Sequence, residues 1–279
     1  MRAEELQPVG GSAVGRWAIG LSVALAACSA LTGLMLFTFG DVLRGTPVMN
    51  GSARGTALVM AVGGVPVLVA GLVAALRGSA RGMFVWFGAA LYLAYNSFLQ
   101  LLGTPLNRLF LLTLLTLSLA IAASIAVAVL LDRLDVAARC GPELPARSIA
   151  GFILAIVVLN ALAWLGRIVP ALVADDPERL LEGTGLTMVP TYLQDLAFWL
   201  PLLGVGAVWL WQRRPWGFLI SGGGLVFWAI ESVTVAVDQW FGHRADPAST
   251  VASDAVVVPF LVVGAVTVGV LAVFLRRVD

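Results

Sequence analysis

The stretch VFWAIESVTVAVDQW, residues 226–240, combines the composition of a membrane-spanning helix with two acids. Glu231 and Asp238 are seven residues apart, and Gly224 and Thr234 fall on the same face at about 100° per residue. A rise of about 1.5 Å per residue puts Glu231 roughly 21 Å into the span, past the midplane on the outer side. A carboxyl at that depth can carry a proton or act as a general acid. Glu231 is therefore the candidate catalytic group.

Polar side chains recur on three other apolar segments. LYLAYNSFLQ (residues 91–100) spaces its polar residues by four, LNALAWLGR (residues 159–167) places three on one face, and a further acid begins the segment near residue 195. We expect these helices to converge on an outward-facing polar pocket around Glu231. Its expected ligand-binding residues are Tyr92, Asn96, Gln100, Asn160, Trp164, Arg167, Asp195 and Asp238.

A charge at the centre of a membrane helix costs about 2.5–3.5 kcal/mol on insertion scales, so Glu231 should face a partner rather than lipid. We expect Arg167 to be that partner, with Asn96 or Asn160 as alternatives if the carboxyl is protonated. A purely structural interpretation stays open. In it, Glu231 and Arg167 lock two helices together, and polar residues such as Gln100 only join helices.

Composition determines which elements position these residues. The chain is 60% hydrophobic and 12% charged, and its mean hydropathy is +0.97. These values predict an all-α, polytopic membrane helix bundle. About 20 apolar residues cross the hydrocarbon core, and eight runs meet that length. The runs are 17–40, 55–76, 83–103, 109–131, 149–172, 192–211, 217–238 and 255–275.

The arginines predict the orientation. All 17 basic residues are arginine, a bias typical of GC-rich bacterial genomes. With the N-terminus inside, eleven arginines lie on the inner side and six on the outer side. We therefore expect a bacterial cytoplasmic (inner) membrane protein with both termini in the cytoplasm.

Several residues recur at a spacing of 135. Pro66 and Pro201 lie inside apolar runs, Gly82 and Gly217 begin the following runs, and Asn96 corresponds to Glu231. This spacing predicts, within one transmembrane domain (1–279), two parallel four-helix halves, 1–140 and 141–279. Coincidence is the alternative, because proline and glycine are common in membrane helices.

Composition also limits cofactors and partners. Without lysine the chain cannot form a retinal Schiff base, and one histidine with two cysteines is too few for haem, zinc or iron–sulfur ligation. We expect no metal and no cofactor. A formal net charge of +1 gives no reason to expect nucleic-acid binding. The expected partners are the lipid bilayer and a small-molecule or lipid ligand.

Three functions fit this pattern. The first is binding of a small or lipophilic ligand in the outer half, for transport or sensing. The second is a membrane-embedded enzyme in which Glu231 protonates an isoprenoid-like substrate while Tyr92, Trp164 and Trp228 face the developing cation. The third is a structural or assembly subunit. The inner half is mostly Gly, Ala, Val and Leu, which disfavours alternating access.

Three segments carry a resemblance: YNSFLQLLGTPLNRLF (95–110), RRPWG (213–217) and ESVTVAVDQWFGHRADPAS (231–249). In these segments the chain resembles uncharacterised multi-pass membrane proteins of actinobacteria and related bacteria. The resemblance implies an eight-helix membrane protein and no known activity.

Overall fold

A computed structural model describes residues 9–39 and 41–278. Within these residues, eight helical segments are long and apolar enough to cross a membrane, so the chain is an all-α, multi-pass membrane protein. Five spans are single α-helices or nearly so, and the others contain a π-helix or a short 3₁₀ turn. The eight spans are Ala13–Thr38 (α1), Pro47–Leu76 (α2, η2 and α3), Ala80–Leu102 (α4), Phe110–Arg133 (α5), Ala146–Val173 (α6), Pro190–Trp211 (α7, η5 and α8), Pro215–Ala245 (α9) and Asp254–Leu275 (η6 and α10).

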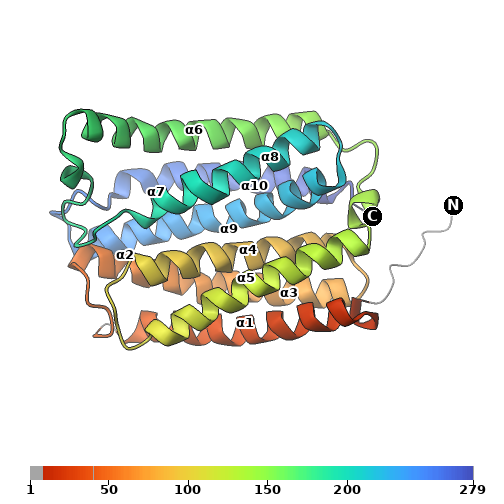
Figure 1. Cartoon of the computed structure of the whole chain (residues 1–279), viewed down its shortest axis with the longest axis horizontal. Helices are drawn as coiled ribbons and strands as arrows, with labels where there is room; N and C mark the ends of the chain where they lie inside the picture. Colours follow the sequence, from red (N-terminus) through yellow and green to blue (C-terminus); the bar gives the residue numbers. More distant parts are fainter. Residues whose placement is uncertain (1–8, 40, 279) are drawn as a thin grey trace.

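The spans run side by side along one axis (Figure 1). We call the end where α1 begins and α10 ends the proximal end, and the opposite end the distal end. Helices α4 and α9 lie in the middle of the bundle and are buried over most of their length, whereas α6 lies at one edge and α1 at the other. The two central helices are the two that carry Asn96 and Glu231.

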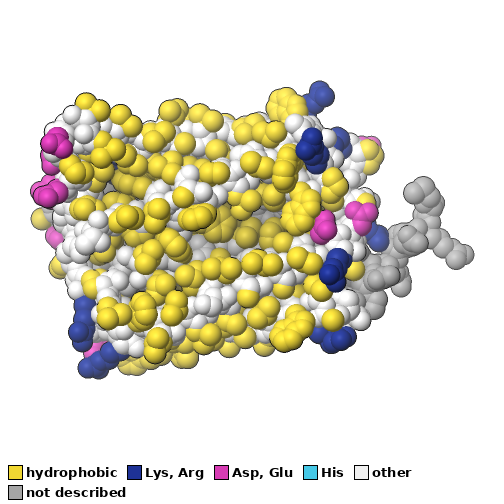
Figure 2. Space-filling model, viewed as in Figure 1, with side chains coloured by type: hydrophobic (Ala, Val, Ile, Leu, Met, Phe, Trp, Pro, Cys, Tyr) yellow, Lys and Arg dark blue, Asp and Glu magenta, His cyan; other side chains and the backbone are white. Residues whose placement is uncertain are grey.

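Charged and apolar side chains occupy different parts of the surface along this axis. Figure 2 shows arginines and acids gathered at the two ends, with hydrophobic side chains covering the surface between them. Exposed leucines, valines and phenylalanines on this surface are the expected lipid contacts of a membrane protein.

Two helix boundaries differ from the sequence prediction by about two turns, more than the others do. The second span begins at Pro47 instead of residue 55, and the seventh ends at Ala245 instead of residue 238. The extra turns are polar, so an apolar run does not include them. They are helical because they pack on one another: Gly51 contacts Phe241, and Gly55 contacts the backbone of Asp238. Trp240, expected just past the helix end, consequently lies inside α9.

A π-helix interrupts the second and sixth spans at matching places. η2 covers Met60–Gly64 and η5 covers Asp195–Trp199, each followed by a helix with proline at its second residue. A proline ring in a regular helix collides with the carbonyl four residues earlier, and here that carbonyl lies in the π-helix. The wider turn relieves the collision. Both bounds of η5 lie 135 residues after those of η2.

The turns into α4 and α9 also match at this spacing. Gly78 and Arg213 both have positive φ, at 84° and 56°. One residue later, the Ser79 N–H donates to the Ala74 carbonyl and the Arg214 N–H to the Trp209 carbonyl, at 3.1 and 2.9 Å. These are the hydrogen bonds of a Schellman turn. Arginine is strained at positive φ, but its Nη2 donates to the carbonyls of residues 142 and 144 at 2.7 and 2.8 Å, which holds the turn in place.

Candidate functional site

Two hydrogen bonds join the central helices in the distal half of the bundle. Asn96 Nδ2 donates to Glu231 Oε2 at 2.6 Å, and the hydroxyls of Tyr92 and Thr234 lie 2.9 Å apart. Asn96 is fully buried and Glu231 is only 9% exposed. Glu231 therefore faces the neighbouring central helix rather than lipid, as the cost of a lipid-facing charge requires.

Glycines bring these helices close enough for the short side chains to meet. A Cβ atom added to Gly88 would overlap Val226 and lie 2.5 Å from the Gly223 carbonyl oxygen. The two backbones therefore touch at this point, about two turns before the Asn96–Glu231 bond. Gly88 and Gly223 are themselves 135 residues apart, as are Asn96 and Glu231.

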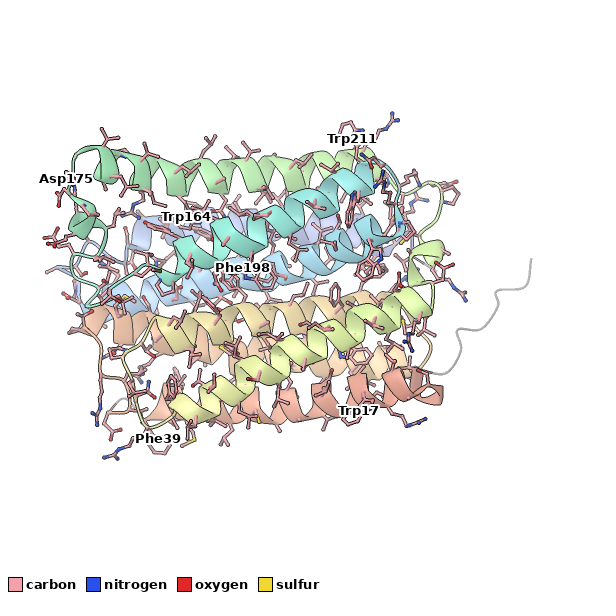
Figure 3. The ribbon with its side chains drawn as sticks, in the orientation of Figure 1. Trp17, Phe39, Trp164, Asp175, Phe198 and Trp211 are labelled. Carbon is pink, nitrogen blue, oxygen red and sulfur yellow. The ribbon has the colours of Figure 1, made fainter. Side chains whose placement is uncertain are left out.

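A second buried acid comes from the π-helix η5. Asp195 is 5% exposed, and its Oδ2 accepts a hydrogen bond of 2.8 Å from the indole N–H of Trp164. Figure 3 shows Trp164 extending from α6 toward the span that contains η5. The hydroxyl of Tyr95 on α4 faces the same carboxyl. Asp195 thus connects the edge helix α6 to the central helix α4.

An aromatic cluster lies beside Asp195. Tyr95 packs against Trp199 and Phe227 with ring centroids 5.6 and 5.2 Å apart, and Trp199 stacks on Phe227 at 5.2 Å. Trp199 and Phe227 in turn line an apolar groove of about 210 Å³ between α4, α5, α8 and α9. The cluster therefore connects Asp195, through Tyr95, to the wall of this groove.

The remaining predicted polar residues have other neighbours. Gln100 Nε2 donates to the Ala53 carbonyl on α2 at 2.7 Å. Asp238 is half-buried, and its Oδ1 accepts a hydrogen bond of 3.1 Å from Gln239. Both lie toward the distal end of the polar layer that contains Glu231.

This layer has more acceptors than donors. Five buried polar atoms on α4 and α7 have no hydrogen-bond partner: Asn96 Oδ1, Ser97 Oγ, Gln100 Oε1, Gln194 Oε1 and Gln194 Nε2. Within residues 9–39 and 41–278, no arginine or histidine forms an ion pair with Glu231, Asp195 or Asp238. Leaving a buried polar atom unpaired costs about 1–3 kcal/mol. Three of these five atoms are amide oxygens, which can only accept, whereas Ser97 Oγ can donate or accept and Gln194 Nε2 donates. Together with the carboxyls, the amide oxygens leave the layer with more acceptors than donors.

The prediction that Arg167 pairs with Glu231 is wrong, and the alternative partner, Asn96, is the residue that contacts the acid. Arg167 is exposed on α6, in the wall of a separate hollow, and α6 packs mainly against α8 rather than against the central helices. Asn160 is half-buried on the same edge helix. The expected single pocket of four converging helices is therefore replaced by pairs: α4 with α9, and α6 with η5. Glu231 lines neither this hollow nor the apolar groove.

Three contributors were absent from the predicted site. Gln194 is 1% exposed next to Asp195, Tyr95 faces the same acid, and Thr234 bonds Tyr92. The sequence signal for Gln194 was its polarity beside an acid in TYLQDL, within an otherwise apolar run. Thr234 already fell on the helical face of Glu231 in the sequence, whereas the role of Tyr95 could be recognised only once its neighbouring helices were known.

Comparison with protein-family models, with curated proteins and with solved structures gives no match. The site is therefore interpreted from its own residues. In the part of the chain that the structure describes, no three His, Cys, Asp or Glu side chains come close enough to hold a metal ion.

Proposed function

We propose that the protein binds a small organic cation, of the amine class, at Glu231 and Asp195 in the distal half of the bundle. The observation that carries this proposal is the surplus of acceptors. Two buried carboxyls from different spans lie in one polar layer with unpaired amide oxygens, and no basic side chain among the described residues forms an ion pair with either acid.

Several ligand classes fit this layer poorly. An anion would be repelled by the carboxyls, and a metal ion needs several oxygens at 2.0–2.6 Å, a clustering that the described acids lack. An ammonium group supplies positive charge and up to three N–H donors.

The packing of the proximal half favours a sensing role over transport. Gly222 packs against the rings of Phe84 and Phe274, and Gly88 packs against Val226 and the backbone of Gly223. This packing leaves no polar route from the acids to the proximal end along the two central helices. A ligand that enters from the distal side would change the contact between α4 and α9 and leave by the same side.

The repeated spacing suggests where the ligand acts. We infer that residues 1–140 and 141–279 are two halves of the same design, because the π-helices, the turns at residues 78 and 213 and the contacts of Gly88 all recur or meet at 135 residues. Asn96 and Glu231 then occupy equivalent positions in the two halves. Binding of a ligand at these two residues would therefore depend on how the two halves pack against each other.

The proposed orientation places the distal end outside the cell, in agreement with the arginine distribution. Cysteine placed at Thr250, in the loop between α9 and η6, should react with a membrane-impermeant maleimide in intact cells, and cysteine placed at Ser148 should react only after lysis. The native Cys140 should stay silent at pH 7, because burial raises the pKa of its thiol to about 12 and the thiolate is the reactive form. The reverse labelling pattern would show that the distal end faces the cytoplasm.

An amine panel tests the proposed function. Purified protein in lipid nanodiscs is heated with primary alkylamines from methylamine to octylamine and with the matching tetraalkylammonium ions. We expect at least one primary amine to raise the unfolding temperature by several degrees, because a ligand at 100 times its Kd adds about 2.7 kcal/mol of stability. Glu231→Gln and Asp195→Asn should each abolish the shift.

Asp132→Asn is the matched control, since Asp132 is an exposed acid near the proximal end of α5. It should respond to the amine as the native protein does. The proposal fails if no amine shifts the unfolding temperature, or if the Glu231→Gln variant responds like the control.

The apolar groove favours one further candidate, an enzyme that protonates an isoprenoid-like chain. Trp199 and Phe227 line the groove and would stabilise a cation in it, while Tyr95 connects them to Asp195. Glu231 is not part of the groove, so Asp195 would be the acid in this version. The amine proposal is preferred because it accounts for both acids.

A further inference from the structure

A second hollow, of about 430 Å³, lies at the distal end of α6, remote from the central helices. It forms where the last turns of α6 face the 3₁₀ turn η4 (Pro177–Leu180), close to the bend marked by Asp175 in Figure 3. Its walls include Arg167, Pro170, Ala171, Asp176, Arg179 and Leu180.

The two arginines of this hollow have no carboxylate partner in the part of the chain that the structure describes. Neither Arg167 nor Arg179 forms an ion pair with any described acid, although Asp176 lies in the same wall. The hollow therefore carries two guanidinium groups against one carboxylate. The planar donors of arginine match the oxygens of a phosphate group in a bidentate geometry.

The depth of the hollow identifies the source of the phosphate. Arg167 lies six residues before the end of α6, which places its backbone about 9 Å inside the distal end of the helix. A guanidinium at that depth extends toward the headgroup layer. Pro170, Ala171 and Leu180 form an apolar wall beside it. Charge next to apolar wall, at the membrane boundary, matches a phospholipid and not a free ion.

We propose that this hollow binds the phosphate of an anionic phospholipid in the distal leaflet, held between Arg167 and Arg179. The bound lipid would fix the end of α6 against η4. This matters for the rest of the bundle because α6 has few other neighbours and carries Trp164, the hydrogen-bond donor to Asp195. The proposal is independent of the amine site, since neither arginine contacts Glu231.

Lipid binding to the full chain in detergent, followed by native mass spectrometry, tests the proposal. The probes are phosphatidylglycerol, diacylglycerol with the same tails, and inorganic phosphate. We expect phosphatidylglycerol to bind, diacylglycerol to bind at least tenfold more weakly, and millimolar inorganic phosphate not to displace the lipid. The Arg167→Gln/Arg179→Gln variant should lose about tenfold or more in affinity, because it removes both charged donors, and hydrogen bonds from a charged donor to phosphate are among the strongest in proteins.

Arg108→Gln is the matched control, because Arg108 is exposed in the distal loop between α4 and α5 and does not line the hollow. It should bind phosphatidylglycerol like the native protein. Arg167→Lys/Arg179→Lys keeps the charge and should lose less affinity than the glutamine variant. Its affinity for phosphatidylglycerol tests the proposal if the glutamine variant fails to fold. Equal binding of diacylglycerol, displacement by inorganic phosphate, or full retention of the lipid by the glutamine variant would each overturn the proposal.

Discussion

Replacing Gly88 with valine should cost about 3 kcal/mol or more of stability, the upper range for side chains forced into packed cores. The new side chain would overlap Val226 and press on the backbone oxygen of Gly223, which cannot move without displacing α9. The Asn96–Glu231 hydrogen bond lies on the same interface and would separate with it. The measurement is the unfolding temperature of the purified protein in detergent, read by size-exclusion chromatography after heating.

Gly20→Val is the control for this change. Gly20 is exposed on α1, and a Cβ added there would meet no atom within 4 Å, so the same substitution faces lipid instead of a helix. We expect its unfolding temperature to stay near that of the native protein. If the two variants unfold at the same temperature, the close contact between α4 and α9 is not what holds the centre of the bundle.

Asn96→Leu should destabilise the protein by about 1–3 kcal/mol, because it leaves Glu231 buried without its amide donor. Glu231→Leu removes the acceptor instead, and Asn96 Nδ2 keeps a 3.3 Å hydrogen bond to the Tyr92 carbonyl, so the loss should be smaller. The double variant should recover most of the stability, since replacing both partners by apolar groups is nearly neutral. A double-mutant cycle on thermal unfolding measures this coupling.

Glu231→Gln separates the stability of this pair from its function. Glutamine keeps the shape and can still accept a hydrogen bond from Asn96, so the unfolding temperature should change little. The variant should nevertheless lose the response to amines. Strictly additive effects of the Asn96→Leu and Glu231→Leu changes would show that the two side chains do not stabilise each other, despite the 2.6 Å contact.

The membrane spans were predictable because apolar length is a local property. Eight runs of sufficient length give eight spans, and the main errors fall where polar turns at residues 47–54 and 239–245 pack between helices. Hydropathy cannot distinguish a polar residue that faces water from one that faces another helix. The π-helices escaped prediction for a related reason, since proline indicates an irregularity but not its form.

The burial of several predicted polar residues followed from the sequence, whereas their pairing did not. Tyr92, Asn96, Asp195 and Glu231 all lie in the buried polar layer. The pairing of Glu231 with Arg167 was wrong because it assumed that α6 lies beside α9, and helix adjacency is not encoded in the polarity of one helix. Asn96, the alternative partner, is the residue 135 positions before Glu231. The spacing of 135 therefore indicated this contact better than the polarity of each helix did.

The contact of residues 96 and 231 has one further consequence. In a homodimer of four-helix subunits, a residue at the two-fold contact always faces its own copy, so an acid there meets an acid and an amide meets an amide. A single chain is free of that restriction. Position 96 can donate while position 231 accepts, so the contact between the two proposed halves has a donor side and an acceptor side. If the chain is built from two such halves, their covalent linkage permits one buried acid at the centre of the bundle without a second acid opposite it.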